Sequence, residues 1–173
     1  MGEVKSIYRA GAENGVGFGI YLTALSIMLM YGFDSVLLMY ASIVLFLGIP
    51  GVVYFYMRKY HVASHGISQF SALWMLGILI FLFGSLICGC VTYVWMQYIE
   101  PTFIYDQVQM AIRLYESVPG ENARMLVDVL ERAIENHMLP SAIDIVIEMI
   151  MLTTFVGSII SMILSAVVRL KRV

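Results

Sequence analysis

Four long apolar stretches constrain this chain more than any other feature of its sequence. They cover Val16–Tyr31, Ser35–Met57, Phe70–Ile99 and Ile145–Leu170. A helix that crosses the hydrocarbon core of a bilayer needs about 20 mostly apolar residues. The sequence therefore predicts an all-α, polytopic membrane protein with four transmembrane helices. The first stretch is too long for the core of a signal peptide, so we expect it to remain attached as an anchor.

The composition agrees with a membrane protein. Of the 173 residues, 61% are hydrophobic and 13% are charged, whereas soluble domains carry about 25% charged residues. Ten basic residues are scattered among twelve acidic ones, and a nucleic-acid binder needs basic residues clustered in a patch. We therefore expect the lipid bilayer as the surroundings of the chain and no nucleic-acid partner.

Most of the basic residues flank one end of the predicted spans. Seven of the ten lie there, namely Lys5, Arg9, Arg58, Lys59, Arg169, Lys171 and Arg172. The other end has the short turn 32–34 and the long segment 100–142, which is rich in acids. Because basic flanks stay in the cytoplasm, we expect both termini to be cytoplasmic and segment 100–142 to lie on the opposite side.

Segment 100–142 has the pattern of two amphipathic helices. The apolar positions of the first are Ile104, Val108, Ala111, Ile112 and Tyr115, and those of the second are Leu126, Val129, Leu130, Ala133, Ile134 and Met138. Charged residues lie largely between them, and Pro119-Gly120 predicts a turn. We therefore expect an extramembrane helical hairpin between the third and fourth spans.

Proline residues set the ends of this hairpin. Glu100-Pro101 predicts a corner, because proline disfavours helix in the residue before it and suits the first turn of the next helix. Ser141 and Asp144 resemble a capping box that opens the fourth span. The predicted organisation is residues 1–99 as three transmembrane helices, 100–142 as a periplasmic hairpin, and 143–173 as the fourth helix with a basic cytoplasmic tail.

The layout of four spans, basic corners and an acidic helical segment opened by Ile99-Glu100-Pro101-Thr102-Phe103 resembles a known family. It is a family of small bacterial four-span membrane proteins known as domain of unknown function 4199. The resemblance extends from about Gly11 to Val168 and implies an inner-membrane protein of Gram-negative bacteria. It brings no established activity and no catalytic residues. It also implies a membrane glycosyltransferase of the cell envelope as a partner.

Two stripes of small residues recur every four positions in the predicted spans. The first consists of Gly11, Gly15 and Gly19, and the second of Thr153, Gly157, Ser161 and Ser165. Such stripes let helix backbones approach closely in lipid. They predict either packing between helices of this chain or an interface with another membrane protein or a second copy.

Two further features raise the alternative of a proton-coupled transporter. Pro50-Gly51 interrupts the second span and predicts a kink, and broken helices line the sites of many transporters. Asp144 and Glu148 are four residues apart at the outer end of the fourth span, and acids within spans default to functional hypotheses. The alternative for both acids is that they lie in interfacial water or pair with an arginine of the hairpin, such as Arg113 or Arg132.

No catalytic motif occurs in the sequence. We therefore expect no catalytic, cofactor-binding or metal-binding residues, since His61 and His65 alone do not make a zinc site. The predicted function is an accessory or assembly subunit without activity of its own, packed against a larger membrane partner. The small transporter that uses the kinked second span and Glu148 is the alternative.

Overall fold

The computed structural model describes residues 6–31, 36–64, 68–136 and 138–170, and every element assigned within them is a helix. The helices are α1 (Ile7–Met30), α2 (Val36–Ala63), α3 (Phe70–Val94), a π-helical turn (Trp95–Ile99), α4 (Phe103–Glu116), α5 (Glu121–Glu135) and α6 (Ala142–Leu170). The predicted turn 32–34 and the basic residues Lys5, Lys171 and Arg172 lie outside these ranges, as does His65.

Four of the helices are long and apolar enough to cross a membrane: Ile7–Met30, Val36–Ala63, Phe70–Ile99 and Ala142–Leu170. The four predicted spans are therefore confirmed as apolar helices. The first helix begins nine residues before the predicted Val16, because the small residues of its first turns continue the helical packing. The second continues past Met57 and includes Arg58 and Lys59 in its last turns.

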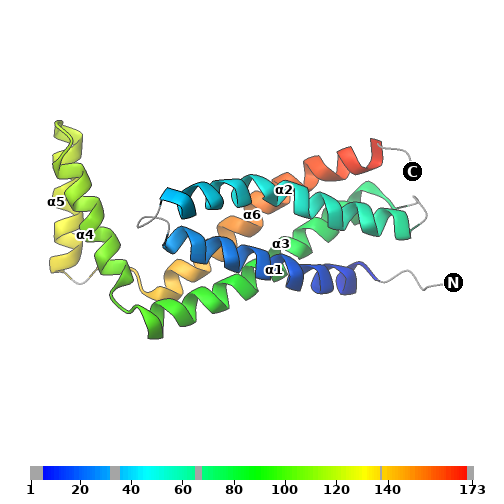
Figure 1. The fold of residues 1–173 in the computed structure, drawn as a ribbon, viewed down its shortest axis with the longest axis horizontal. Coiled ribbons are helices and arrows are strands. Elements are labelled where there is room, and N and C mark those ends of the chain that lie inside the picture. The colour runs from blue at the N-terminus through cyan, green and yellow to red at the C-terminus, as the bar shows by residue number, and fades with distance from the viewer. Residues whose placement is uncertain (1–5, 32–35, 65–67, 137, 171–173) are drawn as a thin grey trace. The chain divides into compact units, whose positions relative to one another are not determined.

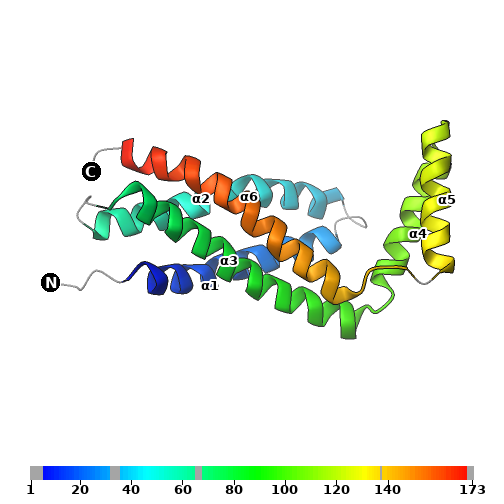
Figure 2. The same ribbon diagram turned by 180° about the vertical axis from the view of Figure 1, so that it is seen from behind.

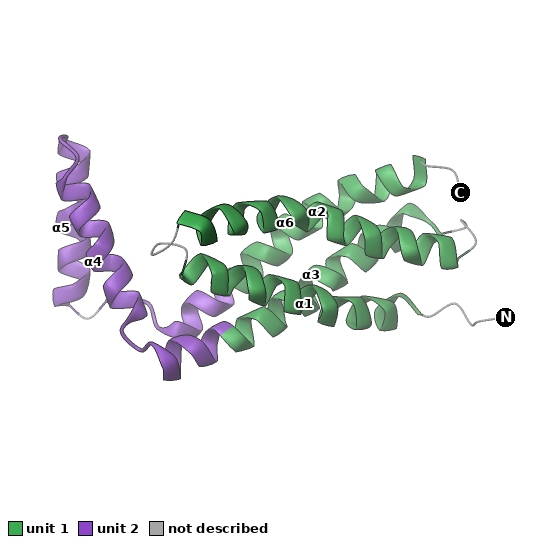
Figure 3. Cartoon of the chain, viewed as in Figure 1, with its two compact units in different colours: residues 1–91, 148–173 green, residues 92–147 purple. Residues whose placement is uncertain are grey.

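The chain divides into two compact units, shown in Figure 3. Unit 1 comprises residues 1–91 and 148–173, and unit 2 comprises residues 92–147. In unit 1, the helices α1, α2, α3 and α6 run side by side in both views (Figures 1 and 2). In unit 2, α4 and α5 pack on each other as an antiparallel pair.

The core of unit 1 draws side chains from all four of its helices. Phe18 of α1, Met57 of α2 and Ile80 of α3 are fully buried, and Val168 of α6 is nearly so. The rings of Phe18 and Phe81 meet edge to face with 5.0 Å between centroids. α3 is the most enclosed helix, with 56% of its most apolar window buried, against 11–28% for the other three. α3 is therefore the central helix of the bundle.

Candidate interaction surface

The glycine stripe of α1 lies against α3. A Cβ atom at Gly11 would lie 2.6 Å from Leu79 Cβ, and one at Gly15 would lie 2.6 Å from Phe83 Cβ. At Gly19 it would lie 2.8 Å from Ile87 Cβ. Real Cβ atoms do not approach this closely, so each glycine provides room for a side chain of α3. The stripe is therefore used for packing within this chain.

The small residues of α6 lie against the opposite side of the same helix. A Cβ at Gly157 would lie 2.2 Å from the ring of Phe81, and a Cβ at Gly77 would lie 2.4 Å from Ser161 Oγ. Ser161 and Ser165 are fully buried, and the Ser165 hydroxyl donates to the Ser161 carbonyl at 2.6 Å. Both stripes thus pack on α3.

The remaining member of the second stripe, Thr153, is half-buried. Its neighbour Thr154 makes a polar contact with α3. Thr154 Oγ1 lies 3.4 Å from Ser85 Oγ of α3. Thr154 and Ser85 were absent from the sequence prediction, because neither falls on a four-residue repeat of small side chains.

Other polar groups of the bundle also join helices. The Trp74 indole donates to the Ser158 carbonyl at 3.1 Å, and Ser26 Oγ lies 3.2 Å from Cys88 Sγ. Hydroxyl groups that bond across helices replace the hydrophobic effect as a source of adhesion in lipid. Among the described residues no group of three or more His, Cys, Asp or Glu side chains could hold a metal ion. These polar groups are spread along the helices and do not converge on one point.

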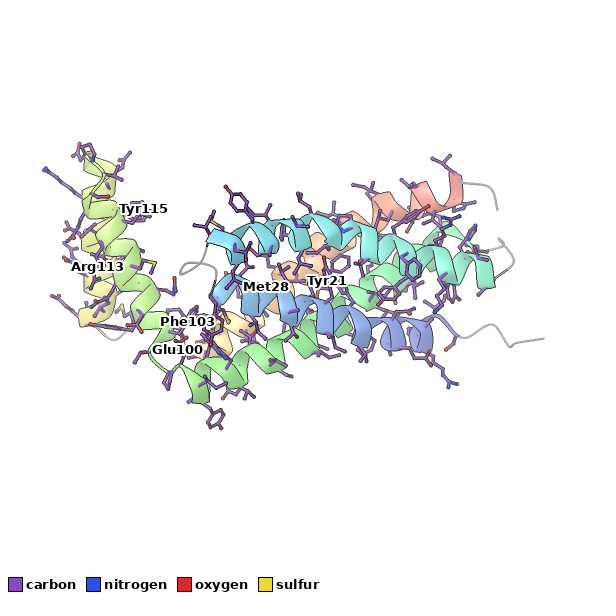
Figure 4. The ribbon with its side chains drawn as sticks, in the orientation of Figure 1. Tyr21, Met28, Glu100, Phe103, Arg113 and Tyr115 are labelled. Carbon is purple, nitrogen blue, oxygen red and sulfur yellow. The ribbon has the colours of Figure 1, made fainter. Side chains whose placement is uncertain are left out.

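α2 continues through Pro50 without a break. The Tyr21 hydroxyl of α1 donates to the Leu45 carbonyl of α2, and a Cβ at Gly48 would lie 2.6 Å from that hydroxyl oxygen. Tyr21 is labelled beside α2 in Figure 4. Gly51, in contrast, is exposed and has open space where a Cβ would be. Pro50 and Gly51 therefore lie on an uncovered side of α2. The sequence predicted that these residues interrupt the second span, but the helix continues through them.

Asp144 belongs to the helix cap that its spacing predicts. The Ser141 backbone N–H donates to Asp144 Oδ2 at 3.1 Å, and the Asp144 N–H donates to Ser141 Oγ at 3.4 Å. This reciprocal pair is a capping box with aspartate in place of glutamate. Glu148 is exposed on α6, and no hydrogen bond or ion pair joins its side chain to another described residue. The two acids therefore have different roles, and Asp144 is a structural one.

The corner at Glu100-Pro101 is a reverse turn. The last turn of the third span widens into a π-helix, which ends where the Glu100 N–H donates to the Trp95 carbonyl at 3.0 Å. The Phe103 N–H then donates to the Glu100 carbonyl at 3.0 Å, which places Pro101 at the second position of a turn, where its fixed φ is favoured. Figure 4 shows Glu100 and Phe103 at this corner. The expectation that Pro101 lies in the first turn of the next helix is wrong, because α4 begins two residues later.

One broad face of the α4–α5 hairpin is a charged groove. It has a volume of about 440 Å³, and its floor contains Ile112 and Ile134. Its polar lining consists of Gln109, Arg113, Glu116, Glu131 and Glu135. With three glutamates and one arginine, the groove is acidic, and it can receive a basic partner. We refer to this surface as the charged groove.

The other broad face of the hairpin is apolar and uncovered. Met110 and Leu114 of α4 are 48% and 63% exposed, and Leu126 and Val129 of α5 are 42% and 62% exposed. Their helical positions lie across the hairpin from those that line the charged groove. We call these four residues the apolar face. Met110 and Leu114 could not be recognised in the sequence, because the single apolar stripe predicted for the first hairpin helix is the one that faces α5.

These features define a helical membrane protein with four apolar helices and a two-faced helical hairpin. A family model described as protein of unknown function, DUF4199, matches residues 13–170. The chain belongs to this family, which confirms the resemblance noted in the sequence. Neither the curated proteins nor the solved structures contain a match.

Proposed function

We propose that this protein is an accessory or assembly subunit of a larger membrane complex, without catalytic activity of its own. The observation that carries the proposal is the contrast between its two units. The polar groups of unit 1 join its helices to one another, whereas the hairpin of unit 2 carries a charged groove with no occupant from the described chain. The hairpin is thus the part of the chain best suited to bind another molecule.

Helix lengths support a hairpin outside the hydrocarbon core. Along α6, Glu148 and Arg169 are about 31 Å apart at a rise of 1.5 Å per residue, and the core of a bilayer is about 30 Å thick. Along α3, Phe70 and Val91 are about as far apart. Unit 2 begins directly beyond both lengths, at Thr92 on α3 and before Glu148 on α6. The charged hairpin then lies outside the hydrocarbon core.

The basic residues support an orientation for this arrangement. Arg9 lies in the first turn of α1, Arg58 near the end of α2 and Arg169 in the last turn of α6, whereas residues 100–141 connect the end of the third span to the start of α6. Because basic flanks remain in the cytoplasm, both termini are cytoplasmic in this proposal and the hairpin is external. In a Gram-negative inner membrane, the compartment that the family resemblance implies, the hairpin would be periplasmic.

The chemistry of the charged groove suggests what binds there. Three glutamates and one arginine over an isoleucine floor suit a partner segment with basic side chains and a small apolar contact. Opposite charges across such a surface favour association and select against acidic partners. A membrane glycosyltransferase remains the first candidate, on the strength of the family resemblance.

Charge reversal in the groove tests this function. The tagged full-length protein is extracted in a mild detergent and its co-purifying proteins are quantified. The double substitution Glu131→Lys with Glu135→Lys should reduce a stoichiometric partner by about tenfold or more, the equivalent of about 1.4 kcal/mol. Glu121→Lys is the control, since it reverses a charge on the same helix and lines neither this groove nor the pocket beside the turn of the hairpin. A wild-type protein that purifies alone, or a partner retained by the double variant, would contradict the proposal.

The structure adds little support for the alternative of a proton-coupled transporter. α2 is continuous through Pro50, and Glu148 lies at the edge of the hydrocarbon length estimated above, where a carboxylate reaches interfacial water. An acid in that position needs no proton pathway to be tolerated. The alternative remains a prediction, and its test is Glu148→Gln, which must abolish function in a folded protein if a proton is carried there.

A further inference from the structure

The apolar face of the hairpin requires a cover. Met110, Leu114, Leu126 and Val129 form it, and each of them is 42–63% exposed. Nothing in the described chain shields these side chains. Proteins rarely leave large contiguous apolar patches in water unless another surface binds them. The face is therefore a binding surface, distinct from the charged groove on the other side of the hairpin.

Residues 103–135 contain six acidic side chains and three arginines. An anionic surface would therefore repel the hairpin, whereas a neutral surface carries no such cost.

The connections of the hairpin bring one neutral surface permanently within reach. Three residues, Glu100–Thr102, join the third span to α4, and residues 136–141 join α5 to α6. Even fully extended, these connections measure only about 10 Å and 20 Å. A tethered surface has a high effective concentration, so the membrane from which α3 and α6 emerge competes strongly for the apolar face.

We infer that the apolar face lies in the headgroup region of the bilayer and turns the charged groove towards water. This inference rests on the external hairpin of the proposed function. Interfacial helices bury their apolar face about 5–10 Å into the boundary between headgroups and acyl chains, and most have a basic polar face that attracts anionic lipid. The polar side of this hairpin is acidic, so it binds a zwitterionic surface in preference to an anionic one.

Spin labels on the full-length protein test this placement. Cys88 and Cys90 are first replaced by alanine and serine, and the protein is reconstituted in phosphatidylcholine nanodiscs. One label is placed on the apolar face through Leu114→Cys, and its matched control on the groove side through Glu131→Cys. Val129→Cys provides a second label on the apolar face, on the other helix of the hairpin, should the first variant fail to fold.

The expected result is that labels at 114 and 129 are relaxed by dissolved oxygen more than by a water-soluble nickel chelate, with the reverse at 131. Phosphatidylglycerol in the nanodisc should increase the accessibility of the labels at 114 and 129 to nickel, and added salt should reverse that increase.

Equal nickel accessibility at 114 and 131 would overturn the inference. Labels at 114 shielded from both reagents would also overturn it, because a protein would then cover the face. The co-purification experiment can fail while this pattern holds, so the two proposals are separable.

Discussion

At the scale of single residues, small side chains set the spacing of the bundle. Gly11, Gly15 and Gly19 each receive a side chain of α3, and Gly157 receives the ring of Phe81. In lipid, such close approach replaces the hydrophobic effect as the main attraction between helices. The sequence could predict that these residues pack, because their four-residue repeat is visible. It could not predict that both stripes meet on α3, because that choice depends on the arrangement of all four helices.

Gly15 provides a direct measure of this packing. Gly15→Ala places a Cβ 2.6 Å from Phe83 Cβ, and overpacking of this kind costs about 1–3 kcal/mol. The free energy of unfolding of the full-length protein in detergent should fall by that amount.

Gly51→Ala is the matched control, since nothing lies within 4 Å of a Cβ there. Alanine is favoured over glycine in a helix by up to about 1 kcal/mol, so this variant should be as stable as the parent protein or more so. Equal losses at the two positions would mean that α1 does not rest on α3 as described.

At the scale of elements, periodicity and hydropathy predict the helices well and their ends less well. The third span was predicted as Phe70–Ile99 and is found as α3 with its π-helical turn. The corner was predicted at Glu100-Pro101, but its form was not, because the widened turn at Trp95–Ile99 and the Glu100–Phe103 turn depend on backbone hydrogen bonds. One apolar stripe was predicted for each hairpin helix, and the exposed pair Met110 and Leu114 came only from the structure.

The start of α6 gives a prediction at this scale. Ser141→Ala removes the hydroxyl that receives the Asp144 N–H, and loss of such a cap costs about 1 kcal/mol. The thermal midpoint of the protein in detergent should fall. Ser141→Thr keeps the hydroxyl and should retain most of the stability. If the alanine and threonine variants were equally stable, the capping box would contribute nothing to the start of this helix.

At the scale of the whole molecule, the proposed arrangement is a chain that crosses the membrane four times and leaves its acidic hairpin on one side. The number of apolar helices could be predicted from the sequence, because each needs only length and composition. The partner and the number of copies could not, since the surfaces that decide them, the charged groove and the apolar face, combine residues from two helices. A single sequence does not record how two helices are rotated about their axes.

Sidedness tests this central claim most directly. In a cysteine-free background, Asn122→Cys reports on the hairpin and Lys59→Cys on the end of α2; both positions are exposed, whereas His61 nearby is buried and is a poor site for a label. A membrane-impermeant maleimide applied to intact cells should label position 122, and position 59 should react only after the membrane is opened. Labelling of both positions, or of neither, in intact cells would contradict the account.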